Sequence, residues 1–101
     1  MIGREFKFHN GKKGSALAIR VSKKKGENRV ERVKNDGTVI IFLSADVENI
    51  NNELIKYLSE LLKIDRKRFD IIAGQDGSDK LLSILDMEPE EVQNLILENI
   101  S

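Results

Sequence analysis

The hydrophobic period changes along the chain, and this change limits the fold more than any other feature of the sequence. Up to about residue 43, apolar residues alternate with polar ones or form a short run, which is the pattern of strands. Over residues 48–63 they recur about every 3.6 residues, which is the pattern of a helix. A strand pattern and then a second helical pattern follow. This alternation within 101 residues predicts one α/β domain, residues 1–101, with residues 1–4 fraying at the terminus.

The first part of the chain predicts four strands. Phe6 and Phe8 alternate with polar residues, and the apolar residues of 16–22 do the same beyond a glycine-bearing turn. A third strand is expected at 29–33. The sequence NDG then predicts a hairpin to a fourth strand, 38–43, because Asp-Gly tolerates positive φ.

Residues 38–43, TVIIFL, are apolar on both faces, so this strand should be central and Ile41 should be enclosed. We expect strands 16–22, 29–33 and 38–43 to be successive antiparallel neighbours, with the first and third pointing the same way. The helix that follows then returns the chain so that strand 69–73 runs parallel to 38–43.

Two helices complete the pattern. The first, 48–63, is capped by Asp46 or Asn49, whose side-chain oxygen accepts a first-turn N–H. Strands 69–73 and 80–85 follow. Pro89 opens the second helix, because proline is tolerated in a first turn. The inward stripe of that helix is expected to be Val92, Leu95, Ile96 and Asn99 or Ile100.

The expected element order is strand, strand, strand, strand, helix, strand, strand, helix. With both helices on one face of a mixed β-sheet, the predicted fold is a two-layer α/β sandwich of the α+β kind. No apolar run exceeds five residues, so no membrane span is expected. The absence of cysteine excludes disulfides, zinc–thiolate sites and cysteine nucleophiles, and favours a reducing cytoplasm.

The stretch IIAGQDGSDKLLSI, residues 71–84, has two glycines and a lysine but not the spacing of a phosphate-binding loop, which also requires a following helix. A hairpin turn is favoured, with Gly74 or Gly77 at positive φ. Asp76 and Asp79 are better explained as solvated turn residues than as cation ligands. His9 has no second histidine beside it, and we expect neither a metal site nor a cofactor.

Charge is divided along the chain. Residues 1–34 hold 11 Lys/Arg against 3 Asp/Glu, whereas residues 35–101 hold 6 against 14, so the two parts carry +8 and −8. This asymmetry suggests an anionic partner for one face or self-complementarity. The loops 22–28, 44–49 and 74–79 should meet at one sheet edge, where ligands of α/β sheets usually bind. That edge would hold Lys23, Lys24, Lys25 and Lys80.

The segments FKFHNGKKGSALAIRV, NDGTVIIFLSA and NELIKYLSELL resemble the YggU-like family of small bacterial and archaeal proteins, whose biochemical function is unassigned. The family's Gly-x-x-Ser/Gly-Arg-x-Lys loop matches Gly74, Gly77 and Lys80, with Ser78 at the arginine position. The family's asparagine matches Asn51, and Asn52 is the alternative. The chain departs from the family at SKKKGEN, which lacks the proline of the family's loop, and at SADVENINN, which has no proline, glycine or lysine.

Three functions remain open. The first is a binding module for RNA or another polyanion. The second is an adaptor that meets an acidic protein surface or places its last helix in a partner's groove. The third, and less favoured, is an enzyme acting on a small phosphorylated or carboxylated ligand, for which no nucleophile and base are recognisable. Residues for the binding module are Lys12, Lys13, Lys23, Lys24, Lys25, Arg29 and Lys80, and the family resemblance adds Asn51, Gly74 and Gly77.

Overall fold

The computed structural model describes residues 3–7, 13–44 and 48–100. The sequence predicts the number, type and order of the elements in this part of the chain. Their bounds are β1 (Gly3–Lys7), β2 (Lys13–Lys23), β3 (Arg29–Val33), β4 (Val39–Leu43), α1 (Ile50–Leu62), a 3-10 turn (Arg66–Arg68), β5 (Phe69–Ala73), β6 (Asp79–Leu85) and α2 (Pro89–Glu98).

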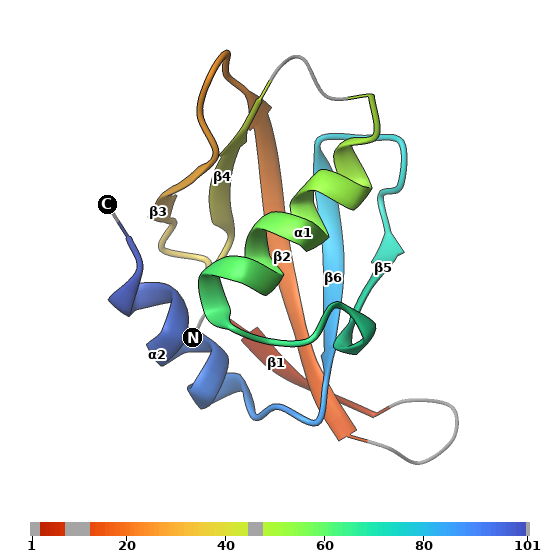
Figure 1. Ribbon diagram of the computed structural model, residues 1–101. Coiled ribbons are helices and arrows are strands. Elements are labelled where there is room, and N and C mark those ends of the chain that lie inside the picture. Colours follow the sequence, from red (N-terminus) through yellow and green to blue (C-terminus); the bar gives the residue numbers. More distant parts are fainter. Residues whose placement is uncertain (1–2, 8–12, 45–47, 101) are drawn as a thin grey trace.

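All six strands of the described chain form one mixed sheet in the order β3-β4-β2-β6-β5, and β1 pairs with the first half of β2. Gly3 and Arg4, which were expected to fray, pair with Leu17 and Ala16. The long strand β2 is the centre of the sheet, because β1 and β4 share one of its sides and β6 takes the other (Figure 1).

One expectation about the sheet is wrong. Strand β3 does not lie between β2 and β4, which pair directly and in parallel, with Val21 opposite Ile41. Instead β3 is antiparallel to β4 at the sheet margin. The physical reason is burial: VIIFL is apolar on both faces and suits a position between two strands, whereas RVERV has three charged residues and suits an edge.

The predicted strand directions are confirmed. Because β6 is antiparallel to β2 and β5 is antiparallel to β6, strands β2, β4 and β5 point the same way. Strand β5 is therefore parallel to β4 in direction, although β2 and β6 lie between them. The carboxyl ends of β2, β4 and β5 consequently meet at one edge of the sheet (Figure 1).

Both helices cover the same face of the sheet, which confirms the two-layer fold (Figure 1). Asn49 caps α1, since its Oδ1 accepts a hydrogen bond from the backbone N–H of Asn52 at 3.1 Å. Asp46, the alternative cap, lies outside the described residues. Pro89 opens α2, and the Glu91 carboxylate accepts a hydrogen bond from the backbone N–H of Glu88.

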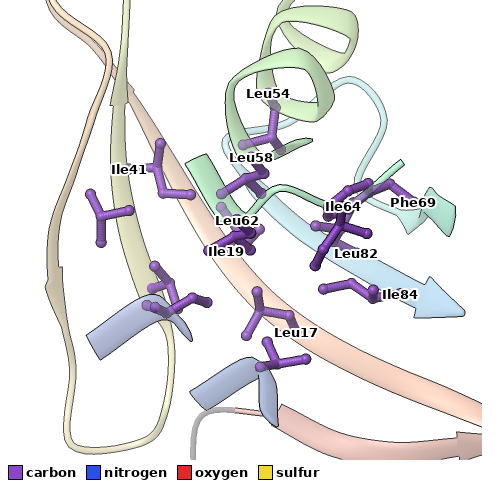
Figure 2. Close-up of a cluster of buried hydrophobic side chains, with 14 of the residues drawn as sticks. Leu17, Ile19, Ile41, Leu54, Leu58, Leu62, Ile64, Phe69, Leu82 and Ile84 are labelled. Carbon is purple, nitrogen blue, oxygen red and sulfur yellow. The ribbon is translucent and has the colours of Figure 1, made fainter. Parts of the chain in front are cut away.

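The core lies between the sheet and the helices. Figure 2 shows Leu54, Leu58 and Leu62 of α1 facing the sheet residues Ile19 and Ile41. Each of these five side chains is at most 4% exposed. This burial is expected, because the helical and strand periods place them on the two surfaces that face each other. Val92 and Ile96 of α2 are fully buried, and Leu95 of the helix and Ile100 just beyond it are partly buried, which confirms the predicted stripe.

Turns and irregularities shape the margins of the sheet. Between β3 and β4, Gly37 has φ +89° and the backbone N–H of Thr38 donates to Asp36 Oδ1 at 2.9 Å, as expected for the NDG hairpin. Strand β3 carries a register shift between Val30 and Arg32, and β5 carries one between Ile71 and Ala73. Both outermost strands of the path therefore bulge.

Candidate functional site

Two of the loops at the carboxyl edge are tied to neighbouring strands by backbone hydrogen bonds. The N–H of Lys24, which follows β2, donates to the carbonyl of Leu43 in β4 at 2.7 Å. The N–H of Val21 in β2 donates to the carbonyl of Ser78 in the β5–β6 loop at 2.8 Å. The convergence of these loops, inferred from strand direction alone, is thus present in the structure.

Asn28 braces this edge from the side of the β2–β3 loop. Its Oδ1 accepts from the backbone N–H of Ser44 at 2.8 Å, and its Nδ2 donates to Glu53 Oε2 of α1 at 2.6 Å. Both partners are distant in sequence, so asparagine in a polar loop gave no signal of this role. The brace connects the β2–β3 loop, the end of β4 and the first helix.

The β5–β6 loop is the predicted hairpin turn, because it leads from one strand into an antiparallel neighbour. Gly74 has φ +77°, and its carbonyl accepts from the N–H of Gly77 at 3.2 Å. A Cβ at Gly74 would lie 2.0 Å from the carbonyl oxygen of Asp79. Of the two candidate glycines, Gly74 is therefore the one that has positive φ and that the turn requires.

Lys80 and Asn51 hold this loop in place. Lys80 Nζ donates to the carbonyls of Gly74 and Gln75, at 3.0 Å each, and Asn51 Nδ2 donates to the same Gln75 carbonyl at 3.0 Å. Lys80 is only 6% exposed, and this burial lowers the pKa of its ammonium group, while the charge of Asp76 acts in the opposite direction. Most of the hydrogen-bond donors of the ammonium therefore bind the loop backbone.

A sequence signal for both roles exists. Lys80 precedes Leu82 and Ile84 at a spacing of two, and those leucine and isoleucine side chains are fully buried on the helix-covered face. Asn51 lies three and seven residues before Leu54 and Leu58 on the buried stripe of α1. A polar residue on an otherwise apolar stripe predicts a buried hydrogen-bonding role.

A pocket of about 300 Å³ opens between the loop and the first turn of α1. Val21 and Ile50 supply apolar walls, Lys23 and Lys80 supply two cations, and Asp76 supplies a carboxylate. A second pocket of about 340 Å³ lies beside it. The two share Ile50, Gln75 and Asp76, and the second adds Glu48, Asn49 and Asn51.

The other cations of the edge surround an aromatic ring. Lys23, Lys24 and Lys25 are exposed, and together with residues 26–28 they form what we name the basic loop. Lys24 Nζ and Arg29 Cζ each lie 5.0 Å from the centroid of the Phe42 ring, within the range of cation–π attraction. Among the described residues, Lys23 and Lys25 form no ion pair.

Phe42 belongs to the sheet surface that neither α1 nor α2 covers (Figure 1). Arg29 and Ser22 flank Phe42 on the neighbouring strands, and Arg32 and Arg20 flank Ile40 in the same way. We call this surface the helix-free face and define it by Arg20, Arg29, Arg32, Ile40 and Phe42.

Three ionic contacts involve charged side chains near this face. Arg20 pairs with Asp79 at 2.8 Å, and the hydrogen bond from Arg20 lowers the pKa of the Asp79 carboxyl. Asp79 is therefore a pairing partner rather than a free cation ligand. Arg29 Nη2 lies 2.9 Å from Glu31 Oε2, and Arg29 Nε lies 3.1 Å from Glu27 Oε1. The Nε group forms no hydrogen bond among the described residues.

The remaining predicted residues lie elsewhere. Lys13 begins β2, whereas Lys23 ends it, so ten residue steps of about 3.3 Å separate the two. Lys13 is thus at the opposite end of the sheet from the basic loop. Lys12 and His9 lie outside the described residues. Whether any of these residues binds a ligand stays a prediction.

No family model matches the chain, so its resemblance to the YggU-like family also stays a prediction. The three family-matched loop positions and Asn51 do form one hydrogen-bonded cluster in this structure. In the part of the chain that the structure describes, neither helix has the length and apolar character needed to cross a membrane.

Proposed function

We propose that this protein is a non-enzymatic, cytoplasmic binding module that contacts RNA through its basic loop and helix-free face. The observation that carries the proposal is the position of Lys24, just after β2, and of Arg29, at the start of β3, around the Phe42 ring and near the exposed Lys25. Lysines neutralise phosphates without reading sequence, while aromatic rings and guanidinium planes stack on unpaired bases. A sheet surface free of helices gives a strand of RNA room to lie across these groups.

The distribution of acidic residues supports the same orientation. Helix α2 and its cap contain Glu88, Glu90, Glu91 and Glu98 and no lysine or arginine. These carboxylates belong to the helical layer, on the opposite side of the sheet from the helix-free face (Figure 1). A polyanion would therefore be repelled from α2 and attracted to the basic loop and the helix-free face, which favours a single mode of approach.

The test is fluorescence anisotropy of a labelled single-stranded RNA across about 50–200 mM salt, where counterion release changes affinity strongly. Removing three phosphate contacts should reduce the slope of log affinity against log salt by about 2, at about 0.7 per contact. The test variant replaces Lys24, Lys25 and Arg32 with alanine. The matched control replaces three exposed cations of the helical side with alanine: Lys56, Arg66 and Lys67.

The control variant should bind like wild type. If wild type does not bind at the lowest salt, or if both variants lose affinity equally, the proposal fails. Phe42→Leu separates RNA from other polyanions, because losing one stacked base should weaken RNA binding about 5- to 150-fold and leave heparin binding unchanged. Salt-sensitive binding to an acidic protein without binding to RNA would place the adaptor function first.

A further inference from the structure

The pocket between the β5–β6 loop and α1 is on the helix side of the edge, and Lys23 is the one residue of the basic loop that lines it. The charged side chains are divided unevenly between this pocket and the one beside it. Lys80 and Lys23 line the pocket of about 300 Å³, and Glu48 lines only the neighbouring one. Asp76 borders both. The two pockets together therefore form a groove with a cationic end and an anionic end.

Lys80 has capacity left for a ligand. A charged ammonium has three N–H donors, and the described residues accept two of them, through the carbonyls of Gly74 and Gln75. Asp76 is near enough to favour the charged form of Lys80, yet the two form no ion pair among the described residues. Opposite charges thus border one space without neutralising each other.

The walls between these charges are apolar. Val21 is 7% exposed at the end of β2, and Ile50 is half-buried at the start of α1. Ligand sites combine such apolar walls with a few placed polar groups, and a volume of about 300 Å³ is at the small end of their range. The occupant must then be a small molecule rather than a polymer.

We propose that this groove binds a small zwitterion, namely an α-amino acid with an apolar side chain. Its carboxylate meets Lys80 and Lys23, its ammonium meets Asp76 and Glu48, and its side chain packs on Val21 and Ile50. A dianionic phosphate is disfavoured by the two carboxylates, and a simple amine is disfavoured by the two lysines. The inference is tested separately from RNA binding, because the RNA test changes Lys24, Lys25 and Arg32, which line neither pocket.

Three probes of similar shape test this proposal: L-leucine, 4-methylpentanoate, which lacks the amine, and 3-methylbutylamine, which lacks the carboxylate. In a two-dimensional ¹⁵N–¹H NMR titration, leucine should shift the amides of Gly77 and Ser78 and bind at least about tenfold more tightly than either analogue. Equal binding of 4-methylpentanoate would overturn the zwitterion assignment. The absence of shifts with all three probes would overturn the site.

Variants locate the contacts. Lys23→Met should weaken leucine binding about 10- to 100-fold, as expected for a lost charge-assisted contact, whereas the exposed neighbour change Lys25→Met should not. Asp76→Asn should remove the preference for leucine over 4-methylpentanoate. The same spectra report whether each variant is folded. Retained binding in Lys23→Met, or equal losses in both lysine variants, would contradict the proposal, while the RNA titration stands or fails separately.

Discussion

Two glycines with nearly equal backbone angles have different surroundings. Gly26 has φ +78° and Gly74 has φ +77°, but a Cβ at Gly26 would meet nothing within 4 Å, whereas one at Gly74 would lie 2.0 Å from Asp79 O. The first position therefore tests the cost of the left-handed conformation alone. The second adds the cost of a steric clash with the backbone.

Gly26→Ala should lower the free energy of unfolding by about 1–2 kcal/mol, the cost of placing an L-residue in the left-handed region. Gly74→Ala should lose a further 1–3 kcal/mol or so, because the β5–β6 loop must move to admit the methyl group. Urea denaturation of the two variants measures the difference. Equal losses would show that the loop yields without cost.

At the level of single residues, the sequence was informative about conformation and less so about partners. The turn at Gly74 and the cap at Asn49 could be predicted, because each depends on a few adjacent residues. The brace at Asn28 depends on partners 16 and 25 residues away and could not. The charge of Lys80 suggests a ligand contact, whereas its position on the buried stripe of β6 indicates a structural role.

Neighbouring isoleucines in β4 test how the strand is enclosed. Ile41 is fully buried against the helical layer, and Ile40 is half-buried on the helix-free face. Ile41→Ala should cost about 2–5 kcal/mol, because the cavity adds to the lost transfer free energy. Ile40→Ala should cost about 1 kcal/mol, since only part of its surface is removed from water. Thermal unfolding of both variants measures this contrast.

A thermal midpoint for Ile41→Ala no lower than that for Ile40→Ala would contradict the assigned faces of the strand. The comparison is well matched because the two residues are adjacent and of one type. It also separates burial from strand propensity, which is the same for both substitutions.

At the level of elements, the strand and helix order could be predicted but the place of β3 could not. The NDG hairpin requires only that β3 and β4 be neighbours, and this holds on either side of β4. Two physical properties decide the arrangement: the two-faced apolarity of β4 and the charges of Arg29, Glu31 and Arg32. Charged side chains on both faces of a strand favour an edge position.

Across the whole molecule, stability should be greatest along β2. This strand pairs with β1, β4 and β6, so its amides are released only when the sheet separates. In native-state hydrogen exchange, the amide of Ile19 in β2 should exchange with the free energy of global unfolding, and the outward amides of β3 and β5 should exchange through smaller openings. Equal protection across all strands would contradict this order.

The charge division of the sequence has a spatial counterpart only in part. The basic loop follows a strand of the sheet, whereas the acidic helix α2 belongs to the helical layer (Figure 1). The two groups of charge are therefore separated in space. The groove beside α1, however, contains both signs of charge. Counting charges along the chain could not have found that mixture, because Lys23, Asp76 and Glu48 come from three separate segments of the chain.

The bulges in β3 and β5 affect how copies of the chain meet in a crowded solution. An outer strand with regular hydrogen-bonding groups is a template onto which another chain can add, and this is how cross-β aggregates grow. In β3 and β5 the register shifts interrupt that regular row near its middle. The margins formed by β3 and β5 therefore discourage the addition of another strand, in a sheet that also contains the strongly apolar strand β4.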